Sequence, residues 1–226
     1  MDGSLPIDSL EEEVGQRLLK IRAADSSGQR SSASILIHRM YATRGYLSTS
    51  LPEAPNANRI TLTASNLDVT IGTITVGFDC AEGLLVDELF SDEVNAMRNR
   101  GRRICEFTKL AMDSVVKSKR ALASLFHVAF IYAFRLRHFN DLLIEVNPRH
   151  VRYYERMLGF EARGPTRLNR RVNAPAVLMS LSLSHCQDQI LKYGGRFDLM
   201  ASEKSLYPFC FSVSEEAGIV GRLQRT

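Results

Sequence analysis

The sequence predicts an α/β domain with a mixed central sheet flanked by helices, followed by a C-terminal extension. Two observations lead to this fold class. β-Rich runs and apolar segments with helical spacing alternate along the chain, in an order that gives both antiparallel and parallel strand neighbours. Of the 226 residues, 45% are hydrophobic and 24% are charged, which is typical of a globular domain and excludes general disorder.

The first half of the domain is expected to hold a strand, a helix and a hairpin. Residues 1–16 are polar and acidic, and we interpret them as a flexible leader because they lack the apolar stretch of a secretory signal. Gly45 stands where a glycine often ends a helix, and Asn66-Leu67-Asp68 where a turn would join two strands. The expected elements are a strand over 17–24, a helix over 32–46, a loop over 51–58, and a hairpin over 60–78 with a bend at Gly72.

The second half is expected to hold the central strands and a long buried helix. The longest apolar run, 121–134, is shorter than the roughly 20 residues that span a bilayer, so we interpret it as a buried helix in which His127 is a core histidine. The domain is expected to cover 17–184, and residues 185–226 form an extension without an assigned role. The expected elements are a short helix over 91–100, a strand over 104–112, a helix over 118–138, a strand over 142–146, a helix over 151–158, and strands over 160–163 and 176–184.

Charge and cysteine content exclude several classes of function. The 29 basic and 25 acidic residues give a net charge of +4, too small by itself to indicate nucleic-acid binding. The four cysteines stand far apart, with no CxxC pair and no histidine at metal-ligand spacing, so neither a metal site nor a disulfide framework is expected. We expect a soluble, cytoplasmic protein without a metal, a nucleic-acid partner or an integral membrane segment.

Three segments, in order along the chain, carry a resemblance to a known family. Residues 102–112 resemble the central strand of acyl-homoserine-lactone synthases, and residues 147–160 resemble the fourth-helix segment of the GNAT acyltransferases. Residues 171–178 are similar to the start of a strand in the long-chain N-acyl amino acid synthases. Together these segments resemble that last family, whose fold is GNAT-like. The matching residues are Glu106 and Lys109, then Asn147, Tyr154 and Gly159-Phe160, then Arg171 and Asn173.

The resemblance implies transfer of a fatty acyl group from an acyl carrier protein thioester to the α-amine of a free amino acid. The donor would bring its own phosphopantetheine, so no cofactor bound to the enzyme is expected. Because a thioester is already activated, the site needs a neutral amine, a fixed geometry and stabilisation of the tetrahedral oxyanion. The amine of a free amino acid has a pKa near ~8, so a base of modest strength suffices.

Glu106 is the candidate base, or the group that positions the amine; the alternative is a structural ion pair with Arg102 or Arg103. Glu106 and Lys109 would face opposite sides of a regular strand. A bulge near Phe107-Thr108 would bring them toward one cleft and free backbone N–H groups for the thioester carbonyl. We therefore assign Phe107, Thr108 and Lys109 to substrate binding.

The segment 147–160 supplies the remaining candidates. Tyr154, or its neighbour Tyr153, is a candidate to protonate the departing thiolate; the alternative is a ring packed in the core. His150 is a candidate acid or base because its pKa lies near neutrality; the alternative is that it caps the helix. Arg149 and Asn173 are assigned to substrate binding. Cys105, flanked by apolar residues, is expected to be buried and inert.

The identity of the donor is predicted from a missing motif. Acetyl-coenzyme-A enzymes of the GNAT superfamily open their third helix with glycines that let the pyrophosphate approach backbone N–H groups. Residues 114–122 contain no glycine, which favours a carrier-protein donor. Lys117, Lys119 and Arg120 would then contact an acidic carrier protein by complementary charge; the alternative is a solvated helix start. Leu125, Phe126, Phe130 and Phe134 either line an acyl tunnel or fill the core.

Three other functions stay open from the sequence alone. They are a coenzyme-A-dependent N-acetyltransferase, an acyl-homoserine-lactone synthase that uses S-adenosylmethionine, and a non-catalytic acyl-binding module. The chain also departs from the family pattern, because Lys109 stands where arginine is usual and Ala42-Thr43-Arg44 lacks acidic residues. A lysine cannot grip a carboxylate with two parallel hydrogen bonds as arginine does, so amino-acid specificity is the property most affected.

Overall fold

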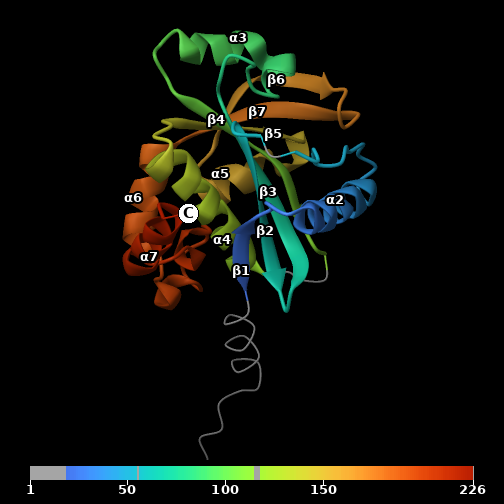
Figure 1. The fold of residues 1–226 in the computed structure, drawn as a ribbon. Coiled ribbons are helices and arrows are strands. Elements are labelled where there is room, and N and C mark those ends of the chain that lie inside the picture. The colour runs from blue at the N-terminus through green and yellow to red at the C-terminus, as the bar shows by residue number, and fades with distance from the viewer. Residues whose placement is uncertain (1–18, 55, 115–117, 226) are drawn as a thin grey trace, which may run out of the picture.

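A seven-stranded mixed sheet lies at the centre of the protein (Figure 1). The computed structural model describes residues 19–54, 56–114 and 118–225, and structural statements refer to these residues. The strand order is β1-β2-β3-β4-β5-β7-β6; β4 and β5 are parallel, and every other neighbouring pair is antiparallel. The mixed sheet confirms the predicted fold class. The strands are β1 (Lys20–Ala23), β2 (Arg59–Asn66), β3 (Val69–Phe78), β4 (Ile104–Met112), β5 (Asp141–Val146), β6 (Glu161–Asn169) and β7 (Ala174–Ser182).

Helices cover both faces of the sheet (Figure 1). α2 and α3 pack their apolar side chains on one face, and α4 and α6 contribute to a larger core on the other, where α7 also packs. No helix in the described ranges is long and apolar enough to cross a bilayer. The helices are α2 (Ser27–Ala42), α3 (Asp87–Arg98), α4 (Lys119–Phe130), the π-helix η1 (Ile131–Leu136), the 3-10 helix η2 (Pro148–His150), α5 (Val151–Leu158), α6 (Leu183–Tyr193), the 3-10 helices η3 (Phe197–Leu199) and η4 (Tyr207–Phe209), and α7 (Val213–Leu223).

Most elements agree with the sequence prediction, and the differences have local causes. The helix expected from residue 32 begins at Ser27 because Ser26 and Gln29 form a capping box, in which each side chain accepts a hydrogen bond from the other's backbone N–H. The helix expected over 118–138 divides into α4 and the π-helix η1. The strand expected over 160–163 continues to Asn169. The leader 1–16 lies outside the described residues.

The hairpin formed by β2 and β3 turns where the sequence predicts it. Leu67 and Asp68 adopt left-handed backbone conformations, with φ of 48° and 63°. Positive φ at both central residues matches the twist of the flanking strands. The predicted bend at Gly72 coincides with a shift of pairing register between Ala64 and Ser65 on the partner strand.

The C-terminal extension is held against α4 by a buried polar network. His127 is buried in α4; its Nε2 lies 3.1 Å from Glu216 Oε2, and its Nδ1 accepts a hydrogen bond from the Phe211 N–H at 3.0 Å. Arg135 Nε donates to the second Glu216 oxygen at 2.7 Å. Because Nδ1 accepts, Nε2 carries the proton and donates to Glu216. His127 is therefore a satisfied core histidine, as predicted, and α7 is anchored to the main core.

Candidate active site

The central feature of the site is a divergence between the two parallel strands. β4 pairs with β5 only from Ile104 to Glu106, opposite Asp141 to Leu143. Beyond those residues β4 continues to Met112 and β5 to Val146, but the two strands no longer pair with each other. Among the strands of the described residues, the only parallel pair therefore opens at its C-terminal end, where backbone hydrogen-bonding groups of both strands face the gap.

A bulge in β4 lies beside this opening. Thr75 pairs with Thr108 and Thr73 with Ala111, so β4 has one residue more than β3 between these pairs. Lys109 lies in the bulge with a left-handed φ of 51°, and its carbonyl accepts a hydrogen bond from the Thr73 hydroxyl at 2.8 Å. The sequence places the bulge at Phe107-Thr108, and the structure places it just after them. The irregularity exists as predicted, displaced toward Lys109.

The bulge also changes which way the side chains of β4 face. Glu106 forms an ion pair with Arg59 at 3.3 Å, and the charge of Arg59 also acts on Lys109. Burial, reinforced by Arg59, lowers the pKa of Lys109 below its ordinary value. Lys109 Nζ donates to the Thr49 carbonyl at 3.0 Å. Glu106 and Lys109 therefore lie on the same side of the sheet, as the sequence predicts for a bulged strand.

Glu106 is fully buried, and its partners differ from those expected. Its two oxygens accept hydrogen bonds from the Leu85 and Val86 N–H groups, each at 3.0 Å, immediately before α3. The structural ion pair exists, but with Arg59 rather than Arg102 or Arg103. Those two arginines are engaged elsewhere, since Arg102 pairs with Asp141 and Arg103 donates to the Arg137 carbonyl. Burial raises the pKa of Glu106 despite these contacts.

A second carboxylate, which the sequence reasoning missed, lies on β5 beside the opening. The Glu145 side chain is 9% exposed, and its Oε2 accepts hydrogen bonds from Arg171 Nη2 and, at 3.0 Å, from Asn169 Nδ2. Its Oε1 is buried without a hydrogen-bond partner in the described part of the chain. Burial raises the pKa of Glu145 to about 7, and the charge of Glu106 acts in the same direction. The signal in the sequence is one acidic residue inside the apolar strand Leu-Leu-Ile-Glu-Val.

Arg171 connects the carboxylates to the start of α3. Besides Glu145, it donates to the Leu85 carbonyl at 2.6 Å and pairs with Glu88 at 2.7 Å. The neighbouring Asn173, predicted to bind substrate, lies exposed in the turn between β6 and β7 with a left-handed φ of 53°. Asparagine tolerates this conformation well, so the turn alone accounts for the residue.

The predicted residues around η2 and α5 form a separate group. Arg149 Nη2 donates to the Tyr46 hydroxyl at 3.0 Å, and its Nε donates to His150 Nε2 at 3.2 Å. Burial, with Arg149 and Arg44 nearby, lowers the pKa of His150. Burial raises the pKa of Tyr154, whose ring packs edge-to-face on Phe160. Among the contacts between described residues, none joins this group to Glu106.

The remaining predicted residues of β4 flank the opening on both faces. Thr108 Oγ1 is buried and has no partner within the described ranges. Phe107 points to the opposite face, where its ring lies 6.0 Å from that of Phe126. Phe107, Phe126 and Phe130 line a cavity of only about 20 Å³, so these three side chains fill the core at this place. Cys105 is fully buried, and burial raises the pKa of its thiol, as expected of an inert cysteine.

The basic residues assigned to carrier-protein docking lie at the start of α4. Ser118 caps this helix by accepting a hydrogen bond from the Ala121 N–H at 3.1 Å. Lys119 lies over the Phe209 ring and Arg120 over the Phe197 ring, at 5.6 and 4.8 Å from the ring centroids. Lys117 lies outside the described residues. Among the residues that the structure describes, no cluster of His, Cys, Asp or Glu could hold a metal ion.

Comparisons with known proteins identify the family. The family model described as "N-acyl amino acid synthase FeeM" matches residues 32–182, well over half of the chain. The structure resembles that of FeeM, an N-acyl amino acid synthase from uncultured soil microbes, with 29% sequence identity and a TM-score of 0.68 over 75% of this chain and 93% of that one. No curated protein sequence matches the chain.

More distant solved structures share the fold. An acetyltransferase of the GNAT family from Streptococcus pneumoniae is 17% identical, with a TM-score of 0.52 over 73% of this chain and 98% of that one. A mutant form of the spermidine N-acetyltransferase from Vibrio cholerae is 16% identical, with a TM-score of 0.50 over 76% and 97%. The fold is therefore GNAT-like. The chain belongs to the FeeM family of N-acyl amino acid synthases and is an acyltransferase, as the sequence predicts.

Proposed function

We propose that this N-acyl amino acid synthase takes a long acyl chain from an acyl carrier protein thioester and attaches it to the α-amine of a free amino acid. One observation carries the assignment of the site. Two buried polar atoms without partners in the described chain, Thr108 Oγ1 and Glu145 Oε1, belong to the two strands that diverge. Buried polar groups normally find partners, so orphans on both strands support a ligand bound between them.

The thioester carbonyl is proposed to bind at the bulge. A bulge takes its extra residue out of the ladder and frees backbone groups near Lys109 and Leu110. N–H groups fixed in this way stabilise the oxyanion without reorganising during the reaction. Thr108 would orient the acceptor amine through its orphaned hydroxyl, and Phe107 would support the strand from the opposite face.

The amine proton is proposed to pass to Glu145, while Glu106 acts as a positioning residue. The amine nitrogen attacks the thioester carbon, the new C–N bond forms, the C–S bond breaks, and one amine proton moves to Glu145 Oε1. The pKa of about 7 suits this transfer, because a useful base has a pKa near the working pH. Glu106 is fully buried and accepts hydrogen bonds from the N–H groups of Leu85 and Val86. It therefore acts on the amine indirectly, because its charge raises the pKa of Glu145 and its hydrogen bonds fix the start of α3.

Lys109 is proposed to bind the carboxylate of the amino acid, with Arg149 and Asn173 as further contacts. Lys109 lies on the Glu106 side of the sheet, and its ammonium already binds an oxygen of Thr49. Burial and the charge of Arg59 lower its pKa, so an anion bound beside Lys109 would favour its charged form. The carboxylate of a free amino acid would supply that anion.

The departing thiolate is proposed to take its proton from Tyr154, with His150 as a second donor. His150 Nε2 accepts the Arg149 hydrogen bond, so Nδ1 carries the ring proton. Because burial raises the pKa of Tyr154, its hydroxyl stays protonated but is a weak acid. We therefore expect Tyr154→Phe to lower kcat less than Glu145→Gln does.

The carrier protein is proposed to dock at the start of α4, through Lys117, Lys119 and Arg120. The segment 114–122 has no glycine to let a pyrophosphate approach the backbone, which disfavours coenzyme A. A carrier protein presents acidic side chains and a single phosphodiester, so basic side chains suffice. In keeping with the sequence prediction, we propose that the reaction takes place in the cytosol.

The experiment that tests this proposal supplies purified protein with one donor and a mixture of amino acids. Myristoyl-acyl carrier protein, myristoyl-coenzyme A and acetyl-coenzyme A serve as alternative donors, and S-adenosylmethionine as an alternative acceptor. Mass spectrometry of the lipid extract is expected to show N-myristoyl amino acids, with the highest kcat/KM for the carrier-protein donor. A higher kcat/KM with either coenzyme A donor, or acylation of S-adenosylmethionine in preference to amino acids, would overturn the proposal.

A further inference from the structure

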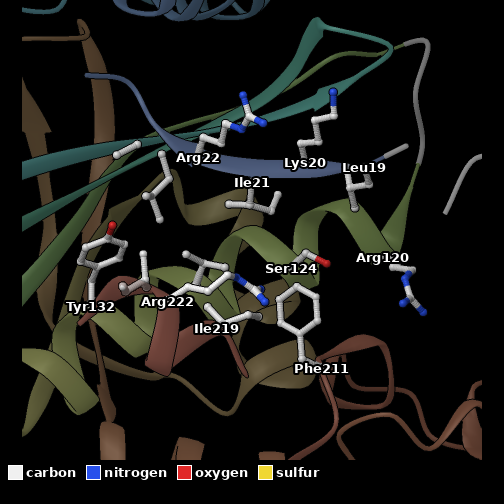
Figure 2. Close-up of a pocket in the computed structure, with 14 residues that line it drawn as sticks. Leu19, Lys20, Ile21, Arg22, Arg120, Ser124, Tyr132, Phe211, Ile219 and Arg222 are labelled. Atoms are coloured by element: carbon white, nitrogen blue, oxygen red, sulfur yellow. The ribbon is translucent and has the colours of Figure 1, made fainter. Parts of the chain in front are cut away.

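A separate cavity of about 350 Å³ lies between β1, α4 and α7 (Figure 2). Its volume falls in the range of roughly 300–1,000 Å³ that is usual for ligand sites. Leu62 of β2 also lines it, and β3 stands between β2 and β4, so at about 4.8 Å for each strand step the cavity lies roughly 10 Å from the diverging strands. It is therefore distinct from the proposed active site.

The wall of the cavity is mostly apolar and follows α4 lengthwise. Side chains alternate along β1, so Ile21 faces the cavity whereas Lys20 and Arg22 point to the other side of the strand (Figure 2). Arg120 and Tyr132 also line the cavity, twelve residues apart, which corresponds to about 18 Å along a helix. The apolar lining residues are Leu19, Ile21, Ala23, Leu62, Val128, Phe211, Ile219 and Leu223. A mostly apolar wall of this length suits one acyl chain.

Two arginines give the cavity its charge. Arg120 lies in the first turn of α4, and its Nη1 is buried without a hydrogen-bond partner in the described part of the chain. The Phe197 ring contacts its guanidinium but offers no acceptor. Arg222 of α7, which already has a partner of its own, reaches in among the lining side chains (Figure 2). No Asp or Glu belongs to the described lining, so an anionic group at Arg120 would satisfy the orphaned N–H.

The opposite end of the cavity is lined by Tyr132, a partly buried side chain that packs against the main core. Tyr132 lies there, in the π-helix η1, and burial together with the charge of Asp25 raises the pKa of its hydroxyl. The orphaned N–H at one end and the packed ring at the other therefore orient an amphiphile with its charged head at Arg120 and its chain toward Tyr132.

We propose that this cavity is a second ligand site, which binds a single-chain fatty carboxylate. The carboxylate accepts a hydrogen bond from Arg120 Nη1, and the chain lies along α4 against the apolar wall. Each methylene buried adds about 0.8 kcal/mol, which corresponds to roughly a fourfold change in affinity. None of its lining residues belongs to β4 or β5, and Arg120 is the one residue that it shares with the proposed carrier-protein docking surface.

The first test is calorimetric titration of the full-length protein with sodium laurate below its micellar concentration. Saturable binding is expected. Sodium decanoate, two methylenes shorter, should bind roughly 15-fold more weakly. Dodecyltrimethylammonium, with the same chain and the opposite charge, should bind at least tenfold more weakly than laurate. Equal binding of the cationic and anionic amphiphiles would overturn the proposal.

Variants then locate the site. Ile219→Trp, on the partly exposed α7, fills the cavity and should weaken laurate binding at least tenfold. Circular dichroism checks that the variant is folded. If it is not, Leu223→Trp repeats the test one helical turn later. Lys109→Gly, in the proposed active site, should bind laurate as the wild type does. Unchanged laurate binding in a folded cavity variant would place the ligand elsewhere. An equal loss of acyl transfer and laurate binding would make the cavity the channel for the donor's acyl chain instead.

Discussion

Gly77 on β3 lies so close to Glu106 on β4 that a β-carbon added to it would stand 2.8 Å from Glu106 Cγ and 2.9 Å from Oε1. The two residues are cross-strand neighbours in the antiparallel pair. Because Gly77 has no side chain, the buried Glu106 carboxylate can occupy the space beside its Cα. Glu106 in turn fixes the backbone at Leu85 and Val86, so one glycine determines where α3 begins relative to the sheet.

Gly77→Ala is therefore expected to displace Glu106 and reduce both stability and activity. Overpacking of a buried site costs about 1–3 kcal/mol, which corresponds to roughly 2–10 °C in melting temperature for a protein of this size. Thermal unfolding and kcat/KM measure the two effects. Gly28→Ala is the matched control, because Gly28 lies in the first turn of α2 with nothing within 4 Å of an added β-carbon. A Gly77→Ala protein as stable and active as the control would contradict the role of this contact.

Glu145→Gln is expected to change the pH dependence of the reaction. Glu145 accepts a proton only when ionised, so activity that depends on it is present above its pKa of about 7 and lost as the pH falls below that value. The amine must also be neutral, with a pKa near ~8. Log kcat/KM of the wild type should therefore rise with slope two below about pH 7 and slope one between about pH 7 and 8.

In Glu145→Gln the slope of two should disappear and kcat/KM should fall about 10²- to 10⁴-fold. Glu88→Gln is the control, since Glu88 also pairs with Arg171 but is largely exposed. Its pH profile should keep the slope of two, with the break at a slightly lower pH, because the charge of Glu88 also raises the pKa of Glu145. A Glu145→Gln enzyme with the wild-type profile would exclude Glu145 as the base. His150, the candidate acid or base in the η2 and α5 group, would then be tested for that role.

The outline of the fold could be predicted from the sequence because its signals are local. The turn at Leu67-Asp68 and the buried helix with its core His127 follow from neighbouring residues along the chain. The bulge was predictable from chemistry, because Glu106 and Lys109 can share one side of the sheet only if the strand is irregular. Its position at Lys109 was not, because β-propensity does not distinguish adjacent residues of one strand.

The electrostatics of the site depend on contacts between residues far apart in the sequence. Nothing in the local sequence joins Glu106 to Arg59, or Glu145 to Arg171 of the β6–β7 hairpin. The sequence offers Arg102 and Arg103 as partners of Glu106 because they are near it along the chain. The structure gives the pairing to a residue of β2, two strands away in the sheet. The raised pKa of Glu145 likewise comes from burial, which only the fold creates.

Glu216→Ala is expected to detach the C-terminal extension from the core. It would leave the buried His127 and the partly buried Arg135 without their shared acceptor, at a cost of about 3–5 kcal/mol in the free energy of unfolding. Urea denaturation measures the loss. Gln224→Ala, at the exposed end of the same helix, should stay within about 0.5 kcal/mol of the wild type.

The pH dependence of this difference follows from the pKa of Glu216. Burial alone would raise that pKa, but the hydrogen bonds from His127 and Arg135 outweigh burial and lower it. A lowered pKa in the folded state contributes stability above the ordinary carboxyl pKa of about 4.5, and this contribution is lost as the pH falls through the folded value. The gap between wild type and Glu216→Ala should therefore narrow below about pH 4.5. A gap that stays constant into acid would show that the loss comes from packing rather than charge.

Substitutions of Lys109 separate the shape of the bulge from its charge. Lysine at φ 51° is in a conformation that glycine adopts without strain, so Lys109→Gly should keep the bulge while removing the ammonium. Its stability should lie within about 1 kcal/mol of the wild type. The KM for the amino acid should rise at least tenfold, because the carboxylate loses its proposed partner, whereas the KM for the acyl donor should change little. Lys109→Val should instead lose stability by roughly 1–2 kcal/mol more than Lys109→Gly, since a β-branched residue resists left-handed backbone. Steady-state kinetics with each substrate varied in turn, together with thermal unfolding, measure both effects. If Lys109→Gly left the KM for the amino acid unchanged, the carboxylate of the acceptor would have to bind elsewhere, and Arg149 would be the next residue to substitute.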